Sequence, residues 1–168
     1  MTASVTAFHP TERFAFAAEL ERHWQQIYGE YLGVQTELID WFERDLYGDG
    51  WQVYGLYDFP HGKPIAANAA RCPLTAELIA RHIPRHGAAG FSRLRPGTRI
   101  RPHQGYQGQF LRCHLALDVP EGDCALRVAG ETRKWSAGKA FVFDDRLEHA
   151  AWNLTAGDRV VLLIDFIP

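Results

Sequence analysis

An arginine and a histidine interrupt what would otherwise be an apolar strand pattern. In the run Phe110–Leu117, strand alternation puts Arg112 and His114 on one face and a row of apolar residues on the other. Polar groups in the middle of a strand are costly unless they are hydrogen-bonded or face a wet pocket. Arg159 begins the opposite face of a last strand whose second face is uniformly apolar. Two arginines on pocket faces predict a binding site for a dicarboxylate.

Two histidines lie at strand boundaries. His103 follows an Arg-Pro pair at the end of a short strand, and His149 follows the acidic turn 144–148. They can approach each other across a sheet and bind a divalent metal as neutral imidazoles. Two histidines alone are weak grounds for a metal site, because an unsupported histidine is more often a surface or hydrogen-bonded core residue.

Charge and composition narrow the class of partner. The formal net charge is only -2 and the lysines and arginines are scattered, so the sequence predicts binding neither to nucleic acid nor to an anionic membrane. A hydrophobic content of 46% over 168 residues is typical of a single globular domain. Small-molecule, peptide or carrier-bound substrates are therefore favoured, and the sequence makes no prediction of oligomeric state.

Cysteine usage and the N-terminus predict a cytoplasmic protein. The three cysteines, Cys72, Cys113 and Cys124, are odd in number and have no C-x-x-C spacing, which argues against a disulfide framework and a structural zinc site. Alternation places Cys113 on a core face, where it is expected to be an apolar filler. No apolar leader opens the chain, and no apolar run reaches the roughly 18 residues of a membrane span.

The first fifty residues predict helices. One apolar stripe with a 3.6-residue period comprises Leu20, Trp24, Ile27, Tyr28 and Tyr31. A second helix is expected over 36–46, with Thr36 as its N-cap and a turn at 48–50 ending it. Its buried face would contain Leu38, Ile39, Phe42 and Leu46.

The remainder, 51–168, predicts a mainly β core. A strand is expected over 51–57 and a short helix over 75–82, and turn signals separate the later segments. These later strands are expected at 91–94, 110–117, 125–128, 140–143, 148–152 and 159–166. Such spacing is typical of a sandwich or barrel, with the N-terminal helices bracing one sheet. No linker divides the chain, so 1–168 is expected to be one domain.

Four blocks of sequence carry a resemblance to a known family. They are RPGTRIRPHQG at 95–105, FLRCHLAL at 110–117, GKAFVFDDRLEHAAWN at 138–153 and DRVVLLIDF at 158–166. In order and spacing they resemble the aspartyl/asparaginyl β-hydroxylases. The resemblance implies a double-stranded β-helix (a jelly roll, cupin-like fold). It also implies a hydroxylase that uses Fe(II), 2-oxoglutarate and O2, and that releases succinate and CO2.

The resemblance also implies roles for individual residues. His103 and His149 match the iron-binding histidines of the family, and Arg159 matches the arginine that binds the distal carboxylate of 2-oxoglutarate. The rest of the cosubstrate pocket is matched by Ser92, Leu94, Arg112 and His114. Trp51, Trp135 and Trp152 are interpreted as core or rim aromatics without a role in the site.

The sequence lacks one acid that most 2-oxoglutarate oxygenases have. Gly105 stands two residues after His103, where the usual two-histidine, one-carboxylate arrangement has Asp or Glu. The resembling family shares this gap, and water is expected at the open position. Asp145 could accept a hydrogen bond from that water, although a solvated turn acid is an equally good interpretation of it.

The substrate is less closely defined than the chemistry. The resemblance implies hydroxylation, at the β-carbon of an aspartyl, asparaginyl or related amino acid that is free, peptidyl or carrier-bound. Phe110 departs from the family pattern at a position that is often basic in the animal members. The main alternative is a non-catalytic, cupin-like module that binds a metal and a small ligand. A cupin enzyme that needs no 2-oxoglutarate is a third possibility, but neither alternative requires a dicarboxylate pocket built from Ser92, Arg112 and Arg159.

Overall fold

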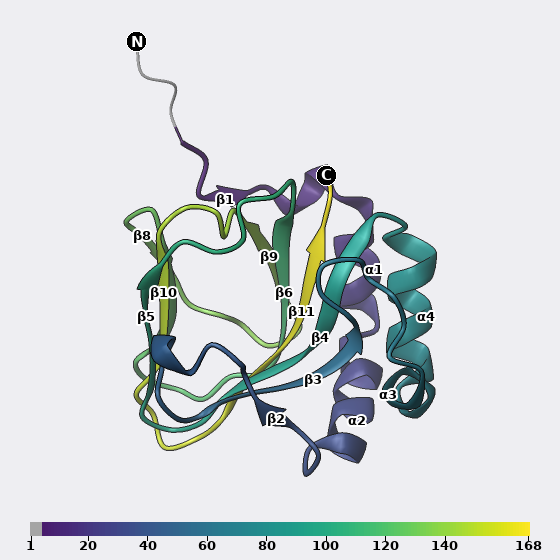
Figure 1. The fold of residues 1–168 in the computed structure, drawn as a ribbon, viewed down its shortest axis with the longest axis horizontal. Helices are drawn as coiled ribbons and strands as arrows, with labels where there is room; N and C mark the ends of the chain where they lie inside the picture. Colours follow the sequence, from purple (N-terminus) through teal and green to yellow (C-terminus); the bar gives the residue numbers. More distant parts are fainter. Residues whose placement is uncertain (1–4) are drawn as a thin grey trace.

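Two antiparallel sheets face each other in the computed structural model, which describes residues 5–168 (Figure 1). The larger sheet contains, in spatial order, β1 (Phe8–His9), β9 (Ala140–Phe143), β6 (Leu111–Asp118), β11 (Arg159–Phe166), β4 (His86–Leu94), β3 (Trp51–Tyr57) and β2 (Ile39–Asp40). The smaller sheet contains β5 (Thr98–His103), β10 (His149–Asn153), β7 (Cys124–Val128) and β8 (Glu131–Arg133). The predicted mainly β, jelly-roll architecture is confirmed. The first four residues of the predicted domain lie outside the described range.

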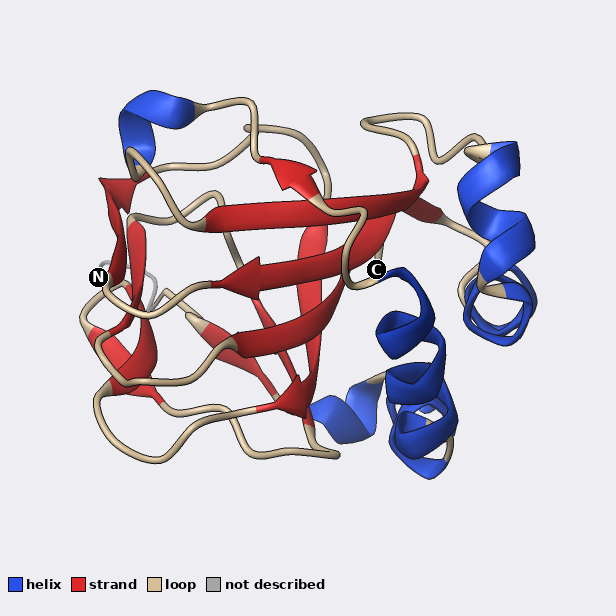
Figure 2. Ribbon diagram, turned by 90° about the horizontal axis from the view of Figure 1, so that it is seen from below, coloured by secondary structure: helices blue, strands red, loops and turns tan. Residues whose placement is uncertain are grey.

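Four helices cover the outer face of the larger sheet (Figures 1 and 2). They are α1 (Ala15–Arg22), α2 (Trp24–Val34), α3 (Ala66–Arg71) and α4 (Pro73–His82), with 3₁₀ turns η1 (Thr11–Arg13) and η2 (Arg44–Leu46). The predicted stripe of the first helix is buried at Leu20, Ile27 and Tyr31, although the helix breaks at His23. The helix expected at 75–82 is also present, within α4.

The helix predicted over 36–46 was wrong. This segment forms the short edge strand β2 and the turn η2, and two members of its supposed buried face, Ile39 and Phe42, are 69% and 73% exposed. Ile39 pairs with Val53 of β3, and the Trp41 ring stacks on that of Trp51 at 4.8 Å. Sheet pairing and ring stacking therefore override a local helical pattern, because local propensity is a weak constraint.

Alternation along the central strands produces two separate cores. The Leu111 face of β6 and the Val160 face of β11 pack against the helices. The opposite faces of the same strands, which carry Arg112, His114 and Arg159, look into the space between the two sheets. The strand-face prediction is confirmed, and it explains how polar groups can lie at the centre of a buried sheet.

The three cysteines are buried thiols with low reactivity. Cys72, Cys113 and Cys124 are all buried and unpaired, as expected from their spacing. Burial raises the pKa of the Cys113 thiol to about 12, so this residue acts as an apolar filler and not as a nucleophile. Across residues 5–168, none of the helices combines the length and the apolar character that crossing a membrane requires.

Candidate metal and cosubstrate site

The smaller sheet brings the two predicted metal histidines together. β5 and β10 are antiparallel neighbours, and His103 and His149 are direct partners in their register. The two imidazole rings lie 4.3 Å apart between centroids. A register shift follows His149, and irregularities of this kind commonly redirect side chains beside functional sites.

Both imidazoles are oriented by backbone carbonyls. Nδ1 of His103 lies 2.7 Å from the Arg101 carbonyl oxygen, and Nδ1 of His149 lies 2.9 Å from that of Leu147. A carbonyl can only accept, so each Nδ1 carries the proton and each Nε2 keeps its lone pair for a metal. Burial lowers the pKa of His149 to about 4, which keeps this imidazole neutral at physiological pH.

Arg159 is a buried cation that has no anionic partner. Its side chain is 2% exposed, and its Nη2 donates to both the carbonyl and the hydroxyl of Ser92. No carboxylate among residues 5–168 lies within 4.0 Å of it, and its buried Nε has no hydrogen-bond partner. Burial lowers the pKa of Arg159 to about 10, because desolvation of the charged form is costly and no carboxylate compensates for it. An anionic ligand would offset that cost.

Ser92 and Leu94 contribute in different ways. The hydroxyl of Ser92 accepts hydrogen bonds from Arg159 Nη2 at 3.0 Å and from Trp51 Nε1 at 3.0 Å. Its own proton is therefore free to be donated to a ligand. Leu94 pairs with Arg159 in the β4–β11 register, and its carbonyl accepts from Asn153 Nδ2, so it positions the strand but does not line the pocket.

Arg112 lines the pocket, but neighbouring carboxylates already compensate its positive charge. Its guanidinium makes two hydrogen bonds with Asp165, at 2.7 and 3.1 Å, and lies 3.5 Å from Asp145. Burial alone would lower its pKa, but the two carboxylates raise it above the ordinary value. Both arginines that were predicted on pocket faces line the pocket, but Asp165 lies on the same interior face and pairs with Arg112. Of these two pocket arginines, Arg159 is the one without a carboxylate partner and therefore the one available to bind a dicarboxylate.

His114 is a neutral member of the pocket. Its side chain is 6% exposed, and its Nδ1 lies 3.1 Å from the indole Nε1 of Trp135. Burial, together with the charges of Arg159 and Arg112, lowers the pKa of His114 well below the usual value. A charged imidazole would add a third positive charge to this interior, and the neutral form avoids it.

Asp145 occupies the space next to Gly105. The Gly105 amide donates to the Asp145 carbonyl at 2.7 Å, and a Cβ on Gly105 would lie 2.5 Å from the carboxylate oxygen Oδ2 of Asp145. Asp145 is only 4% exposed, so its interpretation as a solvated turn acid was wrong. Burial raises the pKa of this carboxyl, whereas Arg112 opposes the shift. A carboxylate from another turn thus lies beside the position of the missing acid.

The structure brings six of the eight predicted site residues into one pocket between the sheets. They are Ser92, His103, Arg112, His114, His149 and Arg159. The donor set fits a divalent metal and a dicarboxylate, because it offers two imidazole lone pairs and an unpaired buried guanidinium. The free space between these side chains is about 30 Å³, roughly the room of one water.

Three residues that sequence reasoning missed support this pocket. Trp51 and Trp135 donate their indole N–H groups to Ser92 and His114, and Asp165 fixes Arg112. The available signal was chemical, since a buried indole needs a hydrogen-bond acceptor and a buried arginine needs a carboxylate. Asp165 could have been assigned from the alternation of β11, which places it on the Arg159 face.

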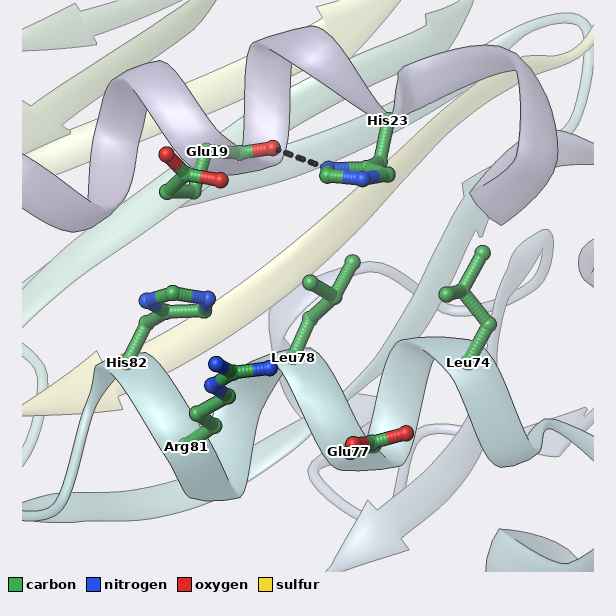
Figure 3. A pocket seen from close by; sticks show the side chains of 7 residues that line it. All are labelled: Glu19, His23, Leu74, Glu77, Leu78, Arg81 and His82. Atoms are coloured by element: carbon green, nitrogen blue, oxygen red, sulfur yellow. Dashed lines mark hydrogen bonds between the residues drawn. The ribbon is translucent and has the colours of Figure 1, made fainter.

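A second cleft, of about 370 Å³, lies on the helical side of the molecule (Figure 3). Glu19 and His23 on one side face α4 on the other, where Glu77 and His82 lie. The Nδ1 of His23 is bonded to the Glu19 carbonyl. No group of three or more histidine, cysteine or acidic side chains gathers around a common metal position anywhere in residues 5–168, so a metal site in this protein has at most two such ligands. We assign the chemistry to the pocket between the sheets, because the paired imidazoles of His103 and His149 and the unpaired guanidinium of Arg159 lie there.

Fold and site together define a cupin-like double-stranded β-helix protein with a histidine pair suited to a divalent metal. Residues 21–168 match the family model of aspartyl/asparaginyl beta-hydroxylase, and the chain belongs to that family. The chain is 36% identical to the ornithine lipid ester-linked acyl 2-hydroxylase of Rhizobium tropici, over 95% of this chain and 59% of that protein. It is 32% identical to the aspartyl/asparaginyl beta-hydroxylase of Homo sapiens, over 87% of this chain and 20% of that protein.

Two solved structures share the fold at low sequence identity. A 2OG-Fe(II) oxygenase family oxidoreductase from Burkholderia pseudomallei superposes with a TM-score of 0.62 at 12% identity, covering 90% of this chain and 88% of that one. A prolyl-4-hydroxylase from Pseudomonas putida gives 0.58 at 16%, covering 88% and 86%. These likenesses support the jelly-roll fold, and the chain spans only part of the two sequence relatives named above.

Proposed function

We propose that this chain is an Fe(II)- and 2-oxoglutarate-dependent hydroxylase. His103 and His149 would hold the metal through Nε2, and Arg159 with the Ser92 hydroxyl would bind the far carboxylate of the cosubstrate. The observation that carries the proposal is the buried, unpaired guanidinium of Arg159 in the same pocket as the histidine pair. A binding module that performs no oxidation has no need of such a costly cation.

The bound groups supply the oxidising power, so that O2 is consumed, 2-oxoglutarate becomes succinate and CO2, and a substrate C–H becomes C–OH. The protein supplies positions and charges. Carbonyl oxygens fix the tautomers of both metal histidines, and the Arg112–Asp165 pair holds a positive group at the pocket wall without creating net charge. Asp145, buried beside Gly105, would accept a hydrogen bond from water at the position that the missing acid leaves open.

Replacing either metal histidine with alanine is expected to abolish turnover. Succinate formation from 2-oxoglutarate should fall by well over about 100-fold in His103→Ala and His149→Ala, because even the outer partners of metal ligands contribute about 10- to 100-fold. The exposed His61 provides the matched control, and His61→Ala should retain full turnover. Calorimetry with Fe(II) under anaerobic conditions should show binding only to wild type and the control. Wild-type protein that binds Fe(II) but neither binds nor decarboxylates 2-oxoglutarate would favour the non-catalytic cupin-like module.

The proposed substrate is an amino-acid unit, oxidised at the β-carbon of an aspartyl, asparaginyl or related residue that is free, peptidyl or carrier-bound. Membership of the aspartyl/asparaginyl beta-hydroxylase family supports this proposal. The cytoplasm remains the predicted location, supported by three buried and unpaired cysteines.

A second candidate is hydroxylation of an acyl chain attached to an amino acid, as in the name of the Rhizobium tropici relative. The observation that favours it is an aromatic cluster defined by Tyr106 and Phe110, on the segment that follows His103, and by Phe59 of the loop between β3 and α3. Phe59 and Tyr106 are 46% and 52% exposed, with ring centroids 5.2 Å apart, and Phe110 lies 6.2 Å from Tyr106. Exposed aromatic rings on a segment that starts at His103 suit an apolar chain better than a charged side chain.

The two candidates predict different effects when the aromatic cluster is removed. If the substrate carries an acyl chain, Phe59→Ala and Tyr106→Ala should each lower kcat/KM for an acylated amino acid by about 10-fold, since burial of an aromatic ring is worth about 1–3 kcal/mol. Substrate-free decarboxylation of 2-oxoglutarate should not change. Leu32→Ala, at an exposed apolar position on α2, is the control. Equal kcat/KM in all variants, with turnover only on aspartyl or asparaginyl peptides, would exclude the acyl candidate.

A further inference from the structure

One buried tryptophan contacts two of the groups that face the proposed cosubstrate. Trp135 lies in the turn between β8 and β9 and is 4% exposed. Its Nε1 lies 3.1 Å from Nδ1 of His114, and the guanidinium carbon of Arg159 lies 4.6 Å from the centre of its ring. Trp135 therefore makes two different interactions in the pocket. The N–H on the edge of its ring donates a hydrogen bond, and the face of the ring attracts a cation.

The hydrogen bond determines which nitrogen of His114 carries the proton. An indole N–H can only donate, so Nδ1 of His114 must be the acceptor and cannot hold a proton. The buried neutral ring then carries its single proton on Nε2. His114 lines the pocket, and this N–H is the polar atom that remains for a ligand.

The two tautomers would give His114 opposite roles. With its proton on Nε2, His114 donates a hydrogen bond to an oxygen of the cosubstrate. With its proton on Nδ1, the Nε2 lone pair would face the pocket, repel a carboxylate oxygen and compete as a further ligand for the metal. The difference matters because the proposed metal site uses only two histidines, His103 and His149.

We propose that Trp135 is a positioning residue that locks His114 as a hydrogen-bond donor to 2-oxoglutarate and holds Arg159 in place for the same ligand. This inference rests on the proposed function for its ligand, but the tautomer of His114 can be measured without metal or cosubstrate. Trp51 has a parallel contact, because its Nε1 donates to the Ser92 hydroxyl and leaves the Ser92 proton free. Both indoles therefore turn a pocket group into a donor.

The test distinguishes the hydrogen bond made by the indole N–H from the contact made by the face of the ring. Trp135→Phe keeps an aromatic face for Arg159 and removes the N–H, whereas Trp152→Phe removes an indole N–H that bonds Asp123 outside the pocket. The ¹⁵N shifts of His114 in the metal-free protein report its tautomer, and calorimetry on Zn(II)-loaded protein reports 2-oxoglutarate affinity. We expect wild type and Trp152→Phe to show protonated Nε2, and Trp135→Phe to show a mixed or reversed tautomer with about 10-fold weaker binding.

Several results would overturn the inference. A proton on Nδ1 of His114 in the wild-type protein is sufficient by itself, even if Trp135→Phe fails to fold. An unchanged tautomer in Trp135→Phe, or an equal loss of affinity in Trp152→Phe, would reduce Trp135 to a packing residue. By contrast, the expected tautomer shift in a protein that never binds 2-oxoglutarate would support the lock on His114 and would contradict the proposed function.

Discussion

Replacing Arg159 with leucine is expected to abolish 2-oxoglutarate binding and at the same time to stabilise the ligand-free protein. The cosubstrate should bind at least about 30-fold more weakly, because removing one partner of a buried charge pair costs roughly 2–5 kcal/mol. In the absence of ligand the same guanidinium is buried without a carboxylate, and its Nε has no partner. Exchanging such a charge for an apolar side chain should raise the free energy of unfolding by about 1 kcal/mol or more.

Arg93 provides the control, because it is a buried arginine in an adjacent strand whose donors are satisfied. It is 8% exposed and is bonded to Gln52, the Tyr31 hydroxyl and the Gln35 carbonyl on the helical side of the sheet. Arg93→Leu should lower the free energy of unfolding by about 2–4 kcal/mol and leave 2-oxoglutarate affinity unchanged. Urea unfolding and calorimetry on the two variants check the pair. Destabilisation by Arg159→Leu comparable to that of Arg93→Leu would show that Arg159 is structural.

The sequence predicted the structure correctly where a single local pattern determines it. Period-two alternation identified which face of β6 and β11 is interior, and it therefore predicted Arg112, His114 and Arg159 as pocket residues before any contact was known. The strands at 140–143 and 159–166 were predicted at their observed bounds, because turn signals delimit them.

The rest depends on partners that are distant in the sequence. The 36–46 segment has a helical apolar pattern. In the structure, however, its Trp41 stacks on Trp51 and its Ile39 pairs with Val53 of β3. Likewise, Arg112 and Arg159 look equivalent in the sequence, and the position of Asp165 gives one of them a carboxylate partner and leaves the other without one. Such contacts are set by tertiary structure, which a local pattern does not contain.

Gly105 is the position where a change back to the common two-histidine, one-carboxylate pattern can be tried, and we expect the change to fail. A Cβ at this position would lie 2.5 Å from Oδ2 of Asp145 and 2.8 Å from its carbonyl oxygen. Side chains have no room there, so Gly105→Ala should destabilise the protein by about 1–3 kcal/mol. Gly105→Asp should cost more, because it also places two buried carboxylates side by side. Metal affinity is expected to fall in both variants, since this turn follows directly from His103.

A glycine with open space around it provides the control, because it shows the effect of adding a methyl group where no neighbouring atom is crowded. A Cβ on Gly29, within α2, would meet no neighbouring atom within 4 Å, so Gly29→Ala should be neutral or stabilising by about 0.5–1 kcal/mol. Adding Asp145→Ala to Gly105→Asp removes the nearest contact and should restore part of the stability, whereas the carbonyl contact remains. Urea unfolding and Fe(II) titration distinguish the outcomes. A Gly105→Asp protein with wild-type stability and tighter metal binding would contradict this prediction. It would show that crowding by Asp145 is not what excludes an acidic side chain at position 105.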